Sequence, residues 1–205
     1  MKVLGIAGSP REKSNSTFLL KEALRAAEEE GAETELIMLK DKNIQHCDGN
    51  WACAETGICD INDDMQEIYE KFEAADGVIV ASPTHFGSVS SYYQKFIERT
   101  LPLMRQKMKD GVPLHVEKFS VLTGKPGGAI VTGRRRGVQG ALDALHFGLL
   151  THGVIIPHGG VAGFCFSLDP EAIKEEDVYA AAMAAEVGRA VVKYIKKLAP
   201  SKVSA

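Results

Sequence analysis

The chain has 205 residues, of which 45% are hydrophobic and 25% charged, and its net charge is -3. This size allows one substantial core, so we expect one domain over 1–198 and a frayed tail over 199–205. The charge gives no reason to expect nucleic acid or an anionic membrane as a partner, and no apolar stretch approaches the ~20 residues that span a bilayer. Since a strand follows Met1 and Lys2 directly, we expect no signal peptide and therefore a cytoplasmic protein. In that compartment its four cysteines are expected to be reduced, metal-bound or redox-active.

Strands and helices alternate along the chain. In chain order we predict a strand over 3–7, a helix over 16–30 closed by Gly31, a strand over 33–39, an irregular insertion over 41–61, a helix over 62–75 capped by Asn62, and a strand over 77–81. A long helix over 89–109, a strand over 128–132, a helix over 138–151, a strand over 153–157 and a helix over 177–198 follow. Five strands separated by helices indicate an α/β fold, a doubly wound parallel sheet with helices on both faces.

The loop over 8–17 joins the first strand to the first helix. A helix N-terminus offers unpaired N–H groups and the positive end of a dipole, which favour anions. The loop adds hydroxyl, amide and guanidinium donors suited to phosphate oxygens: Ser9, Arg11, Ser14, Asn15, Ser16 and Thr17. It predicts a site for one phosphate; the alternative is that Ser14 or Asn15 merely caps the helix. The glycine spacings of a dinucleotide fingerprint and of a Walker A loop are absent.

Two later loops lie at the same edge of the predicted sheet, where ligands of open α/β sheets bind. The loop over 82–90 offers polar and aromatic side chains on a stiff backbone, and its candidate binding residues are Pro83, Thr84, His85, Phe86 and Gly87. The loop over 132–140 contains glycines that allow a planar ring to approach, and its candidates are Thr132, Gly133, Arg135, Gly137 and Gln139. We expect the three loops to surround a flat, phosphorylated ligand.

Three motifs in this order resemble the NADPH-dependent FMN reductase family of flavodoxin-like proteins, in particular its iron–sulfur flavoproteins and their cluster-free relatives. The matching pieces are the loop over 8–17, the loop over 83–90, and Gly133, Arg135, Gly137 and Gln139. The resemblance implies a flavodoxin-like sheet with five strands in the order 2-1-3-4-5 and one FMN per chain. It also implies NAD(P)H as co-substrate, and flavin sites built partly by a neighbouring chain.

The resemblance also implies roles for individual residues. The FMN phosphate would lie on Ser9, Arg11, Asn15, Ser16 and Thr17; residues 83–87 would pack along the ribityl chain and ring, and the loop over 133–139 would meet the other edge of the ring. Many relatives have tyrosine where this chain has His85, which either titrates and modulates the flavin or simply packs against the ring. Arg134 to Arg136 are either solvated surface or a cradle for the 2′-phosphate of NADPH.

Three cysteines share the irregular insertion: Cys47, Cys53 and Cys59. Aligned on the C-x-x-C-x-x-C pattern of the iron–sulfur branch, with its later fourth cysteine, the second position holds Asn50. Because a [4Fe–4S] cluster normally takes four thiolates, we expect no conventional cluster; a cluster, if present, would use those three. The alternatives are free thiols or packing against a neighbouring subunit, for which Trp51 is suited. A zinc site would need closer pairs, and Cys165 is predicted to be a buried apolar residue.

We therefore predict an FMN-dependent NAD(P)H oxidoreductase that passes electrons to an unidentified acceptor. The flavin carries the chemistry, so no catalytic side chain is nominated. The alternatives are an iron–sulfur flavoprotein, a flavodoxin-type electron carrier without significant NAD(P)H turnover, and an interaction protein that has lost its ligand. We expect a homodimer or homotetramer, because the helix over 89–109 has apolar residues on more than one stripe.

Overall fold

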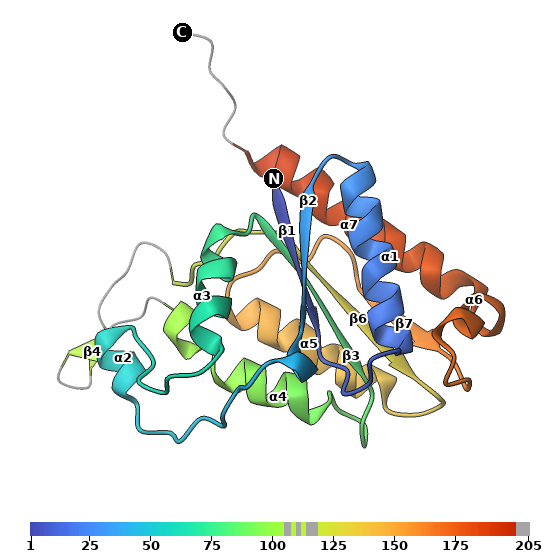
Figure 1. Ribbon diagram of the computed structural model, residues 1–205. Coiled ribbons are helices and arrows are strands. Elements are labelled where there is room, and N and C mark those ends of the chain that lie inside the picture. The colour runs from blue at the N-terminus through green and yellow to red at the C-terminus, as the bar shows by residue number, and fades with distance from the viewer. Residues whose placement is uncertain (105–107, 110–111, 114–118, 200–205) are drawn as a thin grey trace, which may run out of the picture.

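The computed structural model describes residues 1–104, 108–109, 112–113 and 119–199 (Figure 1). Its centre is a five-stranded parallel sheet in the order β2-β1-β3-β6-β7. The strands are β1 (Lys2–Ala7), β2 (Glu33–Met38), β3 (Gly77–Pro83), β6 (Gly127–Gly133) and β7 (Val161–Phe164). Counted along the chain this order is 2-1-3-4-5, so the predicted flavodoxin-like fold is confirmed.

Helices cover both faces of the sheet (Figure 1). One face carries α1 (Asn15–Glu29), α6 (Ile173–Glu176) and α7 (Val178–Leu198); the other carries α3 (Met65–Ala74), α4 (Ser91–Glu98) and α5 (Val138–Thr151). The remaining elements are short: α2 (Ala52–Thr56), 3-10 turns over Leu39–Asp41, Leu101–Leu103 and Pro170–Ala172, and an antiparallel pair formed by β4 (Met108–Lys109) and β5 (Val112–Pro113). No helix in the described part of the chain combines the length and apolar character needed to cross a bilayer.

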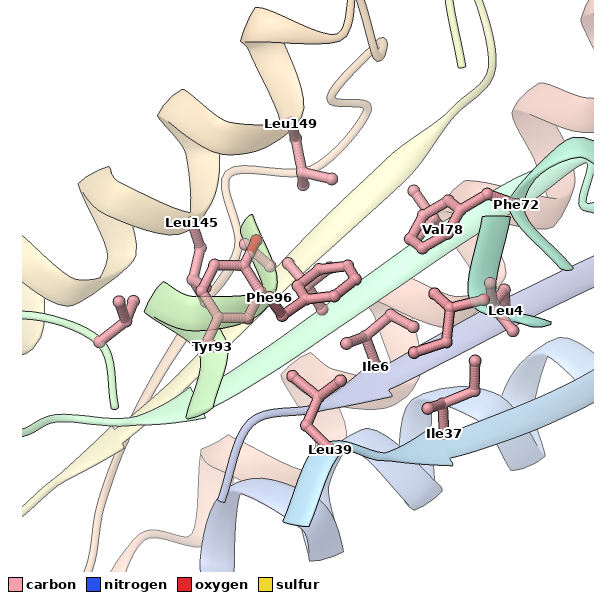
Figure 2. Packing of buried hydrophobic residues seen from close by; sticks show 14 of the residues in the cluster. Leu4, Ile6, Ile37, Leu39, Phe72, Val78, Tyr93, Phe96, Leu145 and Leu149 are labelled. Atoms are coloured by element: carbon pink, nitrogen blue, oxygen red, sulfur yellow. The ribbon is translucent and has the colours of Figure 1, made fainter. Parts of the chain in front are cut away.

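Each face of the sheet buries its own core. Figure 2 shows the core beneath α3, α4 and α5, where Leu4 and Ile6 of β1 lie near the aromatic rings of Phe72, Tyr93 and Phe96. The Phe72 and Phe96 rings are stacked, with their centroids 5.9 Å apart. The strands β3 and β6 are buried along almost their whole length, as expected for central strands of a parallel sheet covered on both faces.

The predicted fifth strand was wrong in position. The segment over 153–157 makes only an isolated parallel bridge, in which Ile155 lies opposite Pro126. Pro157 has no N–H to continue the ladder, and Gly160 turns the chain with a φ of +84°. Pairing with β6 resumes at Val161, opposite Ile130, so the edge strand β7 begins after this interruption.

The predicted helix over 89–109 was also wrong in length. It ends at Glu98, because Pro102 cannot donate to a continuing helix and instead lies in a 3-10 turn. Its later part falls on β4 and on residues 105–107, which lie outside the described residues. Since Tyr93 and Phe96 are buried in the core, they provide no second exposed stripe for a subunit interface.

Three smaller predictions have mixed outcomes. Asn62 does not cap α3: the cap residue is Asp64, and the Asp63 carboxylate accepts the Met65 N–H. The insertion over 41–61 is irregular as expected, except for the single turn of α2. The predicted tail over 199–205 lies outside the described residues from 200 onward.

Candidate functional site

The loop over 8–17 presents unpaired backbone donors. Ser14 is the N-cap of α1: its Oγ accepts the Thr17 N–H at 3.2 Å and donates to Thr17 Oγ1 at 2.8 Å. Capping therefore occurs, but it uses only one of the donors. Ser9, Asn15 and Ser16 are buried residues, and within the described part of the chain no protein group accepts from their backbone N–H groups. Unpaired N–H groups at the start of a helix favour the binding of an anion.

A fourth loop, which we did not predict from the sequence, closes over this helix start. The Asn15 Nδ2 donates to the carbonyl of Ser167 at 3.3 Å, and the Arg11 guanidinium donates to the carbonyl of Leu168. The Asn15 Oδ1 is buried and has no hydrogen-bond partner among the described residues. Carbonyl groups of the loop after β7 therefore bind the side chains of Arg11 and Asn15, and the Asn15 Oδ1 remains available to an external donor. The contacts are separated by more than 150 residues in sequence, so no local pattern signals them.

The loop after β3 is a tight turn. The His85 N–H donates to Ser88 O at 2.8 Å and the Ser88 N–H returns to His85 O at 3.0 Å. Between them, Phe86 and Gly87 have φ angles of +49° and +81°, and the Phe86 side chain is fully exposed. A left-handed phenylalanine is uncommon and costs free energy, so the turn holds this ring in solvent at a conformational cost.

The loops after β3 and β6 approach each other through glycines. A Cβ at Gly137, which has a φ of +76°, would lie 2.4 Å from the Gly87 Cα, so no other residue fits without displacing the backbone. The Thr84 N–H donates to Thr132 O at 2.7 Å, while the Thr84 Oγ1 is buried and has no hydrogen-bond partner in the described part of the chain. These contacts hold the two loops together and leave a second unused polar atom.

A cleft of about 790 Å³ opens where these loops meet, within the range of small-molecule sites. At the margin of the cleft, the Arg135 guanidinium carbon lies 5.3 Å from the centre of the Phe166 ring. The residues around it come from three loops: Thr84, Phe86, Gly87, Arg134, Arg135, Arg136, Gly137 and Phe166. Phe166 is followed by Ser167, whose carbonyl accepts from Asn15, so the loop after β7 contributes both to this cleft and to the contacts of the loop over 8–17.

Other predicted site residues lie around this cleft. Pro83 ends β3 and pairs with Thr132, and Gly133 ends β6. His85 is exposed in the turn. Gln139 lies in the first turn of α5, where its Nε2 donates to the Asp143 carboxylate at 2.7 Å. The site therefore brings together the backbone of all three predicted loops, while the side chain of Gln139 is engaged on its own helix.

The arrangement fits a phosphorylated planar ligand that carries hydroxyl groups. The free N–H groups at the start of α1 suit a phosphate, and the buried Asn15 Oδ1 and Thr84 Oγ1 suit hydroxyl partners. The cleft beside Gly87 and Gly137 is lined by the aromatic rings of Phe86 and Phe166, which suit a planar ring. These features belong to the residues predicted for FMN binding.

The cysteine segment lies apart from this cleft and is closed by side-chain hydrogen bonds. The Asn50 Nδ2 donates to the Asp48 and Asp60 carboxylates at 3.1 and 2.9 Å, and its Oδ1 accepts the Ala52 N–H at 3.0 Å. Among the described residues, no group of three or more His, Cys, Asp or Glu is placed to hold a metal ion. Asn50, which the sequence pattern aligns with the second cysteine of the iron–sulfur branch, therefore has its amide engaged in hydrogen bonds within this segment.

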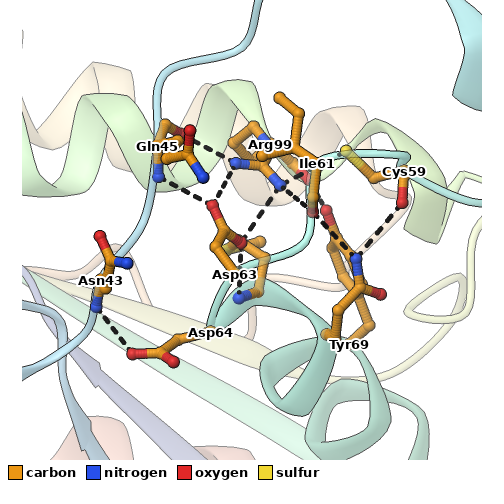
Figure 3. Close-up of polar contacts among 10 residues, drawn as sticks. Asn43, Gln45, Cys59, Ile61, Asp63, Asp64, Tyr69 and Arg99 are labelled. Atoms are coloured by element: carbon orange, nitrogen blue, oxygen red, sulfur yellow. Dashed lines mark hydrogen bonds and ion pairs between the residues drawn. The ribbon is translucent and has the colours of Figure 1, made fainter.

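A buried arginine fixes both ends of the segment (Figure 3). The Arg99 Nη1 donates to Asp63 Oδ2 at 2.7 Å and to Gln45 O at 2.9 Å, and Nη2 lies 3.3 Å from Cys59 Sγ. Burial acts to raise the pKa of Asp63, but the hydrogen bonds from Arg99 and from backbone N–H groups outweigh it and lower that pKa. Burial, with smaller contributions from Cys59 and Cys47, raises the pKa of the Cys53 thiol. Cys165 is buried, as predicted.

Comparisons with known proteins agree with this fold and identify the family. The family model of NADPH-dependent FMN reductases matches residues 1–166. An iron–sulfur flavoprotein of Methanocaldococcus jannaschii is 36% identical over 203 residues, covering 96% of this chain and 98% of the relative. An iron–sulfur flavoprotein of Methanosarcina thermophila is 33% identical over 158 residues, covering 76% of each chain.

Solved structures with low sequence identity share the fold. RosB with a bound riboflavin-phosphate intermediate has a TM-score of 0.75 at 20% identity, covering 97% of this chain and 80% of RosB. An archaeal flavodoxin has a TM-score of 0.58 at 12% identity, covering 96% of this chain and 99% of the flavodoxin. The sequence matches go further than the fold: this chain belongs to the NADPH-dependent FMN reductase family, as a flavoprotein oxidoreductase of its iron–sulfur flavoprotein branch.

Proposed function

We propose that this chain binds FMN, with the phosphate on the loop over 8–17 and the ring in the cleft between the loops after β3 and β6. It oxidises NAD(P)H and passes the electrons to a second substrate. The observation that carries the proposal is that three buried residues, Ser9, Asn15 and Ser16, have backbone N–H groups with no protein acceptor among the described residues. Hydrogen bonds to a charged acceptor contribute about 1.5–3 kcal/mol each, so such a set favours a phosphate strongly.

The remaining polar atoms suit the other parts of FMN. The Asn15 Oδ1 and Thr84 Oγ1 would accept hydrogen bonds from ribityl hydroxyl groups. The N–H groups of Thr84 and His85 are already paired, whereas no described residue accepts from those of Phe86 and Gly87. These two N–H groups are therefore the ones that would stabilise negative charge at the ring edge. Bound FMN supplies the acceptance of hydride and its onward transfer as electrons.

The exposed arginines at the cleft support a nicotinamide dinucleotide as electron donor. Arg134, Arg135 and Arg136 border the same cleft as Phe86 and Phe166, so they could meet a phosphate while an aromatic ring lies in the cleft. The matching family is named for NADPH, which supports the same donor. We propose that these arginines favour NADPH over NADH through its 2′-phosphate.

The test begins with the purified protein and a titration of FMN followed by flavin fluorescence. We expect one FMN per chain, and oxidation of NAD(P)H when an artificial quinone acceptor is added. Because one flavin must take electrons before it releases them, double-reciprocal plots should give parallel lines. Absence of flavin binding would refute the proposal; FMN binding without NAD(P)H turnover would instead indicate an electron carrier.

A cluster-dependent activity is the second candidate, favoured by the names of the relatives. In this chain the Asn50 amide takes part in the bonds that close the loop, so four thiolates are not available there. We therefore propose that NAD(P)H oxidation does not depend on a four-cysteine cluster. Equal turnover by preparations with and without iron would support this, and loss of turnover with iron removal would contradict it.

A further inference from the structure

Ser90 connects the loops over 8–17 and 82–90. It is fully buried at the N-cap of α4, where its Oγ accepts the Tyr93 N–H at 3.2 Å. The same hydroxyl donates to the carbonyl of Gly8, and the Ser90 N–H donates to Ser82 Oγ at 2.9 Å. One side chain therefore caps a helix and holds the loop after β1 at the same time.

Gly8 is fixed on both sides of its Cα. Its N–H donates to Ala81 O at 2.8 Å, and its carbonyl accepts from Ser90. A Cβ at Gly8 would lie 2.9 Å from the Tyr93 Cβ, so there is little room for the peptide to rotate away. The contact with Ser90 therefore sets the orientation of the peptide between Gly8 and Ser9.

That orientation determines where the Ser9 N–H points. In a planar trans peptide the carbonyl and the following N–H point in opposite directions. Because the Gly8 carbonyl faces Ser90, the Ser9 N–H faces away from it. Ser9 is buried, and no described residue accepts from its N–H. The Ser90 hydroxyl thus keeps this N–H available to an external acceptor.

A helix cap alone does not account for this geometry. Capping requires only an acceptor, and Asn or Asp supplies one as well as Ser does. Here the hydroxyl must accept from Tyr93 and donate to Gly8 at once, which a carboxylate cannot do. The donating half of this arrangement acts on the loop over 8–17.

We infer that Ser90 is a positioning residue for phosphate recognition: by holding the Gly8 carbonyl, it directs the Ser9 N–H toward the phosphate monoester of the flavin. The inference rests on the proposed function, because it concerns the same site. It predicts that Ser90 contributes to the discrimination between FMN and riboflavin, which lacks the phosphate. Ser90 itself touches neither flavin.

The experiment compares the affinities of FMN and riboflavin for four proteins: the wild type, Ser90→Ala, Ser90→Thr and Ser91→Ala. Ser91 is the matched control, because it is the next residue, lies exposed in the first turn of α4 and makes no side-chain hydrogen bond in the described structure. Both ligands are titrated by flavin fluorescence quenching, and the thermal unfolding of each ligand-free protein is recorded.

We expect Ser90→Ala to weaken FMN binding by about tenfold to a hundredfold, the effect of one hydrogen bond to a charged acceptor. The affinity for riboflavin, which has no phosphate to accept from the Ser9 N–H, should change by less than about threefold. Ser90→Thr, which keeps the hydroxyl, should restore FMN affinity, and Ser91→Ala should match the wild type. Equal losses for both ligands, or unchanged FMN affinity, would overturn the inference.

A second variant covers the case in which Ser90→Ala does not fold. Ser82→Ala removes the acceptor of the Ser90 N–H and also the hydrogen bond from Ser82 Oγ to Pro83 O, but leaves the Ser90 hydroxyl in place. We expect it to lower FMN affinity more than riboflavin affinity, by a smaller factor than Ser90→Ala does. Equal losses in this variant also contradict the inference. A wild type that binds neither flavin, or binds both equally, would refute the proposed phosphate site itself, so the two failures are distinct.

Discussion

The burial of His152 predicts that the free energy of unfolding falls at mildly acidic pH. Its ring is buried, with Nε2 2.9 Å from Thr100 Oγ1 and Nδ1 3.0 Å from Ser120 Oγ. Since the Thr100 hydroxyl donates to Ile97 O, Thr100 accepts from Nε2, and Ser120 donates to an unprotonated Nδ1. Burial lowers the pKa of His152 from 6.5 to about 4, because the charged ring has no compensating partner there.

The magnitude follows from proton linkage. The unfolded state takes up a proton below its pKa of 6.5, and the folded state does so only near 4, so stability is complete above pH 6.5 and is lost as the pH falls through this window. Relative to pH 7, the free energy of unfolding should fall by about 2 kcal/mol at pH 5 and about 3 kcal/mol at pH 4 from this residue alone.

Urea unfolding at pH 7, 5 and 4 measures this contribution. His152→Gln removes the titration and keeps a donor for Thr100, so it should be less stable at pH 7 but should lose less stability on acidification than the wild type. His146, whose pKa is also lowered by burial, is present in both proteins, so the difference isolates His152. Parallel declines in the two proteins would refute the reasoning.

Four further predictions concern the site and the assembly. Replacing Arg11 and Ser16 together by Ala should weaken FMN binding by several kcal/mol, and an unchanged dissociation constant in a fluorescence titration would exclude this phosphate site. Neutralising Arg134 to Arg136 should raise KM for NADPH much more than for NADH; equal effects would leave the arginines as solvated surface. Anaerobically purified protein should contain little iron and Asn50→Cys about four irons per chain; four irons and four sulfides in the unmodified protein would overturn this. Light scattering at micromolar concentration should give the mass of a dimer or tetramer, and a monomer with bound FMN would contradict that proposal.

Local patterns determined most of the secondary structure. An unbroken apolar run identified β3, and glycine after a helical pattern identified the end of α1. Such patterns depend only on residues close together in the sequence, so they can be read without knowledge of the fold. They failed where two tendencies competed: Pro102 ended a helix whose apolar spacing continued, and Pro157 and Gly160 displaced an edge strand whose apolar residues began earlier.

The sequence also predicted which loops surround the candidate site, because turn residues and hydroxyl donors follow directly after the strands. It identified Asn50 as the residue in place of a cysteine, but not its bonds to Asp48 and Asp60. It gave no sign that Arg99 would be buried beneath the cysteine segment as the partner of Asp63. An exposed arginine and a buried one look the same in a sequence, since the difference lies in which carboxylate folds against it.

What only the tertiary structure decided is how distant backbone groups meet. Asn15 finds its partner at Ser167, and the Gly8 carbonyl finds its donor at Ser90. Such contacts depend on strand order and on the positions of loops at one edge of the sheet, and periodicity carries no information about them. By itself the sequence indicated which residues carry donors suited to a phosphate and which loops could meet a ring. The fold determined which of their N–H and hydroxyl groups remain unpaired, because pairing is settled only when separate loops pack together.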